Sequence, residues 1–586
     1  MSNSNNPLKR HVLACAASLI AATTFSVAAS AQKVPTSVEP GQIQKTLPSP
    51  TKQNLPGLTP KSRTTSKPDS MAPNGSRDIS FVLKELSVEG SSVYKSREFL
   101  RSVEDKVGQE ISVSELFDIA STLTARYRND GYLLSTVIVP PQKIDSGKVT
   151  LKAVEGYLDR IVVEGVTAKQ KRKILRYLNK VVGQRPLKSK NLERYLLLVD
   201  DLSGVKLKTF MQPSTENGGA ATLTVKPQIE RFNVWSSADS RGTEFVGPYN
   251  LALGGTLHAP NVLGQSISGQ VATTPPNTEE LQYVSLSFAQ EVGYEGTSVT
   301  VSASGMRSEP GQELRQLELE SEALNFDMAI RLKPYRSRDA NVYISLAGSI
   351  KEAETKALDS VLSQDRARQV KFGLDFQGID NFLGANSFSF AASQGIDAMG
   401  STPEGSALQS RFDADPEATW FNVGFTRVQS LAKWRPGFDL KASVAAQYAF
   451  EPLSAAREFS IGGMANASAF DSSEINGDNG LSGRLEVRYA TSLGAIDRGV
   501  SEGWRGFAVQ AYAFGDGGQV WQTRVGDQER DNGQTDDMIA SAGAGLRFNL
   551  GPYTSATVEV AKPFLNVVAS EGNKDPRVFF SFTNRF

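Results

Sequence analysis

A long tract of strict alternation between apolar and polar residues constrains the fold of this chain more than any other feature. From about Gln228 to Phe586 no helical periodicity is found, and one segment after another places apolar side chains at every second position. Examples are the apolar sets Val299/Val301/Ala303, Val370/Phe372/Leu374/Phe376, Leu485/Val487/Tyr489 and Val578/Phe580/Phe582. Because successive side chains of a strand point to opposite faces, the pattern predicts many strands with one apolar and one polar face.

The polar face of these strands separates two architectures. A soluble sandwich buries the apolar faces of two sheets against each other, whereas a transmembrane barrel turns them to lipid and its polar faces to an aqueous lumen. Arg484, Glu486 and Arg488 occupy successive positions of one polar face, and we interpret them as salt-bridge residues of a lumen. At roughly 20–24 residues per strand with its connection, the tract holds about 15–18 strands, and even numbers favour 16. We therefore predict a transmembrane antiparallel β-barrel over residues 228–586.

Composition excludes several other classes of protein. The 63 basic and 63 acidic side chains balance, which argues against a nucleic-acid-binding protein with a basic surface. No run of about 18 apolar residues occurs, so no transmembrane helix is expected. The only cysteine is Cys15, and the only histidines are His11 and His258. We therefore expect no enzyme, no cofactor and no metal site, and we interpret His258 as structural.

The N-terminus carries the pattern of an export signal. Lys9 and Arg10 precede an apolar run over residues 12–29, and Ala29-Ser30-Ala31 matches a signal peptidase site, so residues 1–31 are predicted to be a signal peptide. Residues 32–78 contain eight prolines among polar residues and are predicted to be an extended linker. Residues 41–47 form at most about two helical turns, because Pro48 ends any helix there.

Residues 79–155 form a first predicted α/β module. A strand pattern over residues 81–88 comes first, and Ser112 with Glu115 then makes a capping box for a helix that reaches Tyr127. Gly131 stands where the helix C-cap belongs, and residues 133–139 and 148–154 read as two strands.

Residues 156–227 repeat this order, with a strand over residues 158–163 and a helix capped by Thr167 and Gln170. A second helix around Leu192 and strands over residues 205–210 and 221–225 follow. Tandem copies of one supersecondary unit are typical of stacked modules. The basic run at residues 169–173 is interpreted as the solvated face of a helix rather than as a patch for an acidic partner or nucleic acid.

Motifs in all three regions resemble one family. Those of the first module are Tyr127, Gly131-Tyr132, Val139-Pro140-Pro141-Gln142 and Glu155-Gly156. Those of the second module are Leu192-Glu193-Arg194-Tyr195-Leu196-Leu197 and Leu202-Ser203-Gly204-Val205. Those of the barrel are Asp239-Ser240-Arg241-Gly242, Asn261-Val262-Leu263-Gly264, Phe459-Ser460-Ile461-Gly462-Gly463, Phe514-Gly515-Asp516-Gly517-Gly518 and Ala561-Lys562-Pro563-Phe564. Residues 79–586 thus resemble the outer-membrane transporters of two-partner secretion, of the haemolysin secretion/activation type. This resemblance implies a 16-stranded barrel preceded by two periplasmic POTRA domains.

The resemblance also implies a loop, at about residues 464–480, that folds into the barrel after Gly462 and Gly463. In the family, the arginine of a Val-Arg-Gly-Tyr/Phe motif on this loop pairs with the aspartate of a Phe-x-Asp motif on the barrel wall. That wall motif is Phe514 and Asp516 here, but the loop carries Ala467-Ser468-Ala469-Phe470, which keeps the aromatic residue and lacks the arginine and the glycine. We therefore expect Asp516 to lack its usual partner. The inward-folded loop, which we call the lid, is expected to be held loosely unless Arg484 or Arg488 reaches Asp516.

By resemblance, the protein is an outer-membrane translocase that secretes a partner protein from the periplasm to the surface of a Gram-negative bacterium. The implied partners are this secreted protein, unfolded in transit, the lipid of the outer membrane, and the barrel-assembly machinery, which reads the terminal strand ending at Phe586. An exposed edge strand of a POTRA sheet is expected to pair with the unfolded chain. Family members often carry an N-terminal plug helix, which Pro48 and Pro50 are expected to make weak or absent here. Two alternatives stay open: a barrel-assembly factor of the related insertase group, and a passive porin.

Overall fold

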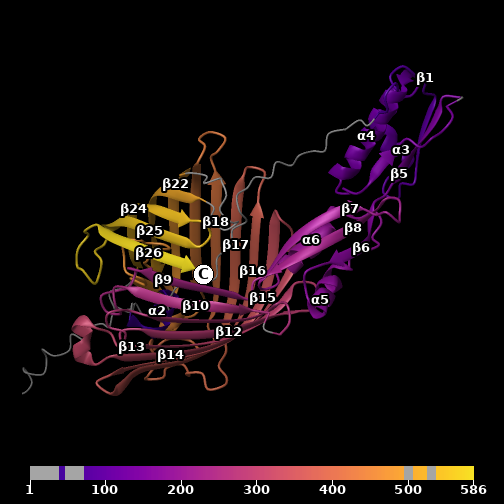
Figure 1. Cartoon of the computed structure of the whole chain (residues 1–586). Coiled ribbons are helices and arrows are strands. Elements are labelled where there is room, and N and C mark those ends of the chain that lie inside the picture. The colour runs from indigo at the N-terminus through magenta and orange to yellow at the C-terminus, as the bar shows by residue number, and fades with distance from the viewer. Residues whose placement is uncertain (1–37, 47–71, 145, 260, 494–505, 524–535) are drawn as a thin grey trace, which may run out of the picture.

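The computed structural model describes residues 38–46, 72–144, 146–259, 261–493, 506–523 and 536–586. The predicted signal peptide and most of the predicted linker lie outside these residues. Two small α/β modules follow one another along the chain and lead into a closed barrel (Figure 1).

The first module packs its helices against a three-stranded sheet. Its elements are β1 (Ser80–Val82), β2 (Glu85–Glu89), α3 (Ser96–Leu100), the 3₁₀ helix η2 (Arg101–Lys106), β3 (Glu110–Ser112), α4 (Val113–Asn129), β4 (Thr136–Ile138) and β5 (Lys148–Val154). The sheet order is β2-β5-β4, while β1 pairs with β3. The predicted capping box of Ser112 and Glu115 is confirmed at the start of α4. The single strand predicted over residues 81–88 is wrong in detail, because the chain there divides into β1 and β2.

The second module has the same kind of sheet and a longer free edge. Its elements are β6 (Tyr157–Val163), α5 (Ala168–Leu178), α6 (Ser189–Asp200), β7 (Val205–Pro213) and β8 (Ala220–Ile229). The predicted cap of Thr167 and Gln170 is confirmed at the start of α5. The sheet order β6-β8-β7 leaves the nine-residue β7 at an edge, and most of its residues are exposed.

Sixteen antiparallel strands close into one barrel, which confirms the predicted fold class. In chain order they are β9 (Phe232–Asp239), β10 (Asn250–His258), β11 (Gln265–Thr273), β12 (Gln282–Val292), β13 (Thr297–Ser308), β14 (Glu320–Arg336), β15 (Ala340–Ala357), β16 (Ser360–Ile379), β17 (Gly384–Gly395), β18 (Thr419–Ser430), β19 (Phe438–Ala449), β22 (Asn479–Leu493), β23 (Phe507–Trp521), β24 (Asp536–Leu550), β25 (Thr554–Leu565) and β26 (Arg577–Arg585). Short 3₁₀ helices, η3 (Gln312–Leu317) and η4 (Ala455–Arg457), lie in loops at the end of the barrel opposite the modules. We call the module-bearing end the near end and the other the far end.

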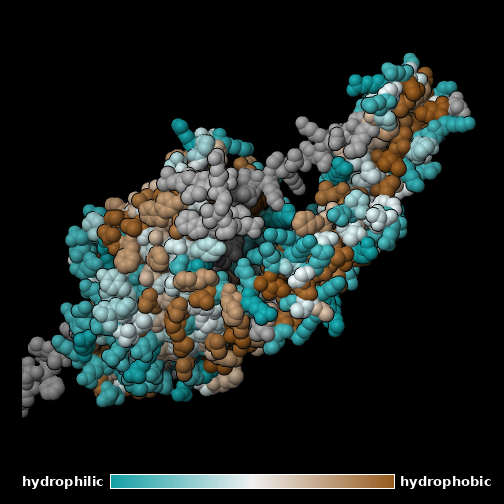
Figure 2. All heavy atoms as spheres, in the orientation of Figure 1, coloured by the Kyte–Doolittle hydropathy of each residue, from teal (hydrophilic) through white to brown (hydrophobic). Residues whose placement is uncertain are grey.

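The alternating pattern sorts side chains between the outside and the inside of the barrel. On β22, Leu485 and Val487 are 50% and 47% exposed. Arg484 and Glu486, each of which directly precedes one of them in the sequence, are only 6% and 1% exposed. Figure 2 shows hydrophobic side chains over the outer faces of barrel strands and hydrophilic ones around the far-end loops. The interpretation of Arg484 and Glu486 as lumen-side residues is confirmed.

The seam between the first and last barrel strands is short. β26 and β9 pair over five residues, from Ser581 opposite Asp239 to Arg585 opposite Trp235. The amide of Phe586 then donates to the Val234 carbonyl (2.8 Å), while the Phe586 side chain is exposed on the outside. The terminal aromatic residue therefore extends the pairing that closes the barrel.

The second module docks on the near-end turns of the barrel. The guanidinium of Arg336 on β14 binds both carboxylate oxygens of Asp201, at 2.8 and 2.9 Å. Lys169 donates to the Asn261 carbonyl (3.2 Å), and Lys173 donates to that of Leu263. The interpretation of residues 169–173 as a solvated helix face holds for Lys169, which is exposed although it reaches a turn carbonyl. It is wrong for Lys173, which is partly buried where the turn between β10 and β11 lies against α5.

A short helix, α2 (Pro40–Thr46), lies against the inner wall of the barrel. Val38 and Ile43 are buried with Met306 of β13 and Ala323 of β14. Gln42 is fully buried and donates to the Ala455 carbonyl (2.5 Å). The helix is as short as the prolines require. Because it lies in the lumen, the structure rules out an absent plug, and the expectation of a weak plug stays a prediction.

Candidate functional site

The loop between β19 and β22 turns back into the lumen and forms the lid. It covers residues 450–478, so it begins earlier than the predicted 464–480. A small hairpin of β20 (Phe459–Ile461) and β21 (Ile475–Gly477) forms its stem. Gly462 follows β20 with φ +136°, and a Cβ there would lie 2.0 Å from the Asp471 carbonyl oxygen. Only glycine fits this position, which explains the first of the paired glycines.

The tip of the lid is a tight turn over residues 467–470, closed by a hydrogen bond from the Phe470 amide to the Ala467 carbonyl (3.0 Å). Phe470 is 1% exposed and packs in an apolar pocket with Phe514 of β23 and Phe579 of β26. The predicted lid residues Ser468, Ala469 and Phe470 are therefore all brought to the barrel wall, together with the Phe514 and Asp516 motif.

Charged side chains of β22 to β25 form a buried network on the wall behind the lid. Arg484 contacts Asp516 (2.7 Å), Glu486 (2.8 Å) and Glu559 (3.2 Å). Its guanidinium also lies 3.7 Å from the ring centre of Phe514. Because this pairing and stacking are shielded from solvent, they hold the carboxylates in fixed positions.

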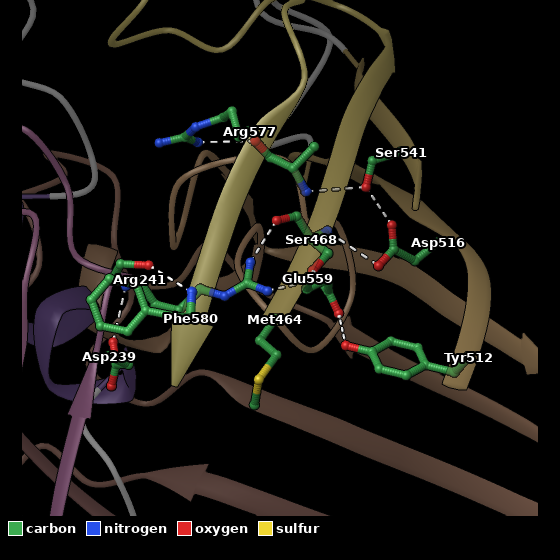
Figure 3. A network of polar contacts seen from close by, with 12 residues as sticks. Asp239, Arg241, Met464, Ser468, Tyr512, Asp516, Ser541, Glu559, Arg577 and Phe580 are labelled. Atoms are coloured by element: carbon green, nitrogen blue, oxygen red, sulfur yellow. Dashed lines mark hydrogen bonds and ion pairs between the residues drawn. The ribbon is translucent and has the colours of Figure 1, made fainter. Parts of the chain in front are cut away.

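A second arginine reaches the lid tip from the loop after β9. Arg241 donates to the Ser468 carbonyl (2.7 Å) and pairs with Glu559 (2.6 Å). The Ser468 hydroxyl also donates to Glu559, and the Ser468 amide donates to Asp516 (3.1 Å). Figure 3 shows these side chains converging on Ser468 from different strands of the wall.

Asp516 lacks the lid arginine, as expected, but one of the two alternatives that the sequence left open, Arg484, reaches its carboxylate. Arg484 lies directly opposite Asp516 in the register of β22 and β23, so the guanidinium reaches the carboxylate across one strand pair. Asp516 also accepts bonds from the Ser541 hydroxyl and the Ser468 amide. The loose lid that was predicted from the missing arginine is not what the geometry supports. Arg488, the other candidate, pairs with Asp439 instead.

The motif residues of the first module stabilise that module. Tyr127 is fully buried, and its hydroxyl is hydrogen-bonded to the Ser91 hydroxyl (2.7 Å) and to the Glu155 carboxylate (3.1 Å). Burial raises the pKa of Tyr127 to about 12. The Gln142 amide bonds both main-chain groups of Thr150 on β5, each at 2.9 Å.

The neighbouring motif positions shape the turn that follows α4. Gly131 takes φ +93° after the helix, Tyr132 is 9% exposed in the module core, and Pro140 lies in the partly buried segment after β4. These positions specify the fold of the module and do not reach the lid.

Sequence reasoning missed several residues of the site. Ser541 of β24, Glu559 of β25 and Arg577 of β26 all contact the lid tip. Each lies on an inward face of an alternating strand, and Glu559 stands between Val558 and Val560. A single charged residue on the inward face of a strand was the sequence signal that could have identified Glu559 as part of the site. His258 forms a hydrogen bond with Ser203 of the second module (2.6 Å), consistent with a structural role.

The lid also holds a carboxyl group with a shifted pKa. Burial raises the pKa of Glu474 to about 7, against the lowering effect of the amides of Ala569 and Asp471 that donate to it. No group of three His, Cys, Asp or Glu side chains placed to hold a metal ion is found within the described ranges. Among the same residues, no helix is both long enough and apolar enough to span a membrane.

Comparison with known proteins identifies the family. The model of the haemolysin secretion/activation protein ShlB/FhaC/HecB family matches residues 221–548, more than half of the chain. The chain belongs to this family. The ShlB-type POTRA domain model matches residues 81–156, which is the first module. As a ShlB/FhaC/HecB protein, the chain is an outer-membrane transporter of two-partner secretion that acts on a secreted partner protein. The near end of its barrel faces the periplasm.

Curated relatives cover most of the chain at low identity. The heme/hemopexin transporter protein HuxB of Haemophilus influenzae (strain 86-028NP) is 22% identical over 498 residues, which are 84% of this chain and 85% of HuxB. The outer membrane transporter CdiB of Escherichia coli O6:K15:H31 is 22% identical over 432 residues, which are 71% of this chain and 70% of that CdiB.

Solved structures support the fold. CdiB from Escherichia coli superposes with a TM-score of 0.68 at 17% identity, covering 91% of this chain and 94% of that one. CdiB from Acinetobacter baumannii gives a TM-score of 0.57 at 16% identity, covering 93% and 96%.

Proposed function

We propose that this transporter passes its partner protein, unfolded, through the barrel lumen after the lid and α2 have moved aside. One observation carries the proposal. Pairing between neighbouring strands closes the wall all the way round. The lid tip is held by hydrogen bonds to side chains of the wall and by apolar packing, and α2 is held against the wall by apolar packing. The two segments that fill the lumen can therefore leave without opening the barrel itself.

The edge strand β7 is the proposed receptor for the partner on the periplasmic side. An edge strand has unpaired main-chain groups, which an extended polypeptide satisfies by adding a strand. β7 has nine residues, and Phe210 and Met211 expose apolar side chains there. The edge strand β4 of the first module has only three residues, which is too short to hold an unfolded chain.

Outer-membrane lipid and the barrel-assembly machinery complete the proposed set of partners. Lipid contacts the exposed apolar faces of the strands, where Leu324 and Val578 are 64% and 66% exposed. The machinery recognises the last strand, β26, and Phe586 after it.

The receptor is tested by placing a charge on its edge. Phe210→Asp together with Met211→Asp should reduce secretion several-fold, because charges on an edge strand oppose the addition of another strand. Partner protein is measured in the culture supernatant, and folded barrel by its shift in mobility on heating. Val107→Asp, at an exposed apolar residue of the first module, is the matched control. Normal secretion by the double variant, with normal barrel levels, rules out β7 as the receptor.

A further inference from the structure

We propose that the wall behind the lid is a binding site for a tight turn of the secreted polypeptide, and that the lid tip occupies it in the resting state. The ligand class is a reverse turn with small central residues followed by an aromatic residue. The inference rests on the proposed function, because it adds a binding site to the path of the chain through the lumen.

The wall recognises the main chain of the lid tip. The Ser468 amide donates to Asp516 (3.1 Å), and the Ser468 carbonyl accepts from Arg241 (2.7 Å). The Ala469 amide donates to Ser541 (3.2 Å), and the Ala469 carbonyl accepts from Arg577 (2.9 Å).

These four groups are what any tight turn presents. The bond between the first and fourth residues closes the turn, so the amides and carbonyls of the two central residues point outward and need other partners. Here all four have a partner on the wall. Because every peptide carries the same groups, the site selects a conformation more than a sequence.

Two features of the lid side chains restrict which turn sequences fit the site. Ala469 is fully buried, so the second central position admits only a small residue. Phe470 fills the adjoining apolar pocket, which makes an aromatic residue the preferred next one. The Ser468 hydroxyl adds one bond to Glu559, and serine is itself common in turns.

The site can be vacated because its charges are paired on the wall. Arg484 pairs with Asp516 and Glu486, and Arg241 pairs with Glu559. Asp471, the lid residue that follows the tip, pairs with Arg577 (2.8 Å).

Arg577 also has a partner outside the lid, Glu571, at 2.8 Å. When the lid withdraws, Arg577 therefore keeps a counter-charge on its own side of the contact. The donors and acceptors remain in place for another turn.

The test removes the lid tip and supplies it as a peptide. In the full chain, deletion of residues 464–471 leaves its two ends close, since a Cβ on Gly463 would lie 2.7 Å from the Ser472 hydroxyl. The probe is a synthetic peptide with the sequence of residues 463–472. The matched control peptide is N-methylated at the amides of Ser468 and Ala469, which removes two donors and leaves every side chain unchanged.

Single-channel recordings in planar bilayers measure the block of current. The parent peptide should block the deletion variant, and N-methylation should weaken the block at least tenfold. Adding Arg241→Gln to the deletion variant should also weaken it. Equal block by both peptides overturns the proposal, because it shows that main-chain groups are not recognised.

If the deletion variant does not assemble, Phe470→Ala replaces it. This variant keeps the lid at full length but removes the ring from its pocket, so the parent peptide should compete with the lid and block the channel. Absence of block there overturns the proposal. Secretion is measured separately. A channel that is blocked but does not secrete retains the site and contradicts the proposed function, whereas one that secretes and is not blocked contradicts the site alone.

Discussion

At the scale of residues, Ser468 decides how the lid is held. Its hydroxyl donates to Glu559, its carbonyl accepts from Arg241, and Glu559 in turn pairs with both Arg241 and Arg484. Both guanidinium groups stack at 3.7 Å from the ring centres of phenylalanines on neighbouring strands. The wall thus already carries the positive charge that the family resemblance assigns to the lid.

We predict that Ser468→Arg loosens the lid. The site is fully buried, so a third guanidinium meets two like charges and displaces the hydroxyl bond to Glu559. Current fluctuations in planar bilayers should increase, while the amount of folded barrel stays normal. Steadier current in Ser468→Arg would contradict this prediction.

The matched control adds Arg241→Ser to Ser468→Arg. This double variant returns the number of guanidinium groups near Glu559 from three to two, as in the unaltered protein. Its current fluctuations should therefore fall back toward those of the unaltered protein. Contacting residues in such a double-mutant cycle are expected to couple by roughly 0.5–3 kcal/mol. If the effects of Ser468→Arg and Arg241→Ser on the current fluctuations are simply additive, Arg241 does not hold the lid.

The family resemblance predicted the lid and its wall motif, and it left Arg484 and Arg488 as two candidate partners of Asp516 without deciding between them. Motif spacing places Ser468 where the family has its arginine. Because serine carries no positive charge to pair with Asp516, a loosely held lid was the expectation. Arg484 is 32 positions from Asp516 along the chain, and only the strand register places them opposite each other. Register depends on all neighbouring strands and turns, so it could not be obtained from one segment.

At the scale of elements, α2 is a short helix that follows a carboxyl group with a shifted pKa. Burial, followed by the nearby carboxylates of Asp365 and Glu458, raises the pKa of Glu39, just before the helix, to about 7. The length of the helix followed from Pro48. Its position did not, because the apolar pocket for Val38 and Ile43 is assembled from strands and loops far along the chain.

We predict that α2 is released as pH rises. The pKa of Glu39 is about 7 when α2 is docked, whereas its ordinary value is 4.5. Below pH 4.5 the carboxyl group is protonated in both the docked and the free helix, so docking has its full strength there. Between these values the free form ionises first, so docking weakens and reaches its lowest strength above pH 7. Single-channel conductance should therefore be higher at pH 8 than at pH 5, and Glu39→Gln should keep it low at pH 8.

Glu474 is the necessary control, because its pKa is also raised to about 7. Glu474→Gln tests the contribution of the lid to the same pH response. A response in Glu39→Gln that equals the one in the unaltered protein would exclude Glu39 as its source.

At the scale of the whole molecule, the barrel was predictable and the docking of the second module was not. Alternation with a period of two is imposed on every strand by lipid outside and water inside, so it repeats along residues 228–586. Docking depends on contacts that residues of distant barrel turns make with the module, both apolar, as at Leu263, and polar, as at Asp201. A basic helix face has the same sequence pattern whether it is solvated or docked. Lys173, which is partly buried against a barrel turn, illustrates this.

The docking contact sets the position of β7 relative to the lumen, and Asp201 is its central residue. Arg336 holds both oxygens of Asp201, and Lys333 lies 3.5 Å away. Removing one member of a shielded pair typically costs about 3–5 kcal/mol, because the other charge is left uncompensated. We predict that Asp201→Arg, which places three cations together, frees the second module and lowers secretion at least tenfold, while folded barrel forms normally.

The charge-swapped variant, Asp201→Arg with Arg336→Asp, should recover part of the secretion because it restores one opposite pair. Glu164→Arg, at an exposed residue of the same module, controls for the change in charge alone. Protease sensitivity of the segment between the second module and β9 gives an independent readout, since an undocked module exposes it. Full secretion by Asp201→Arg, together with increased cleavage, would show that the partner reaches the lumen without a fixed second module.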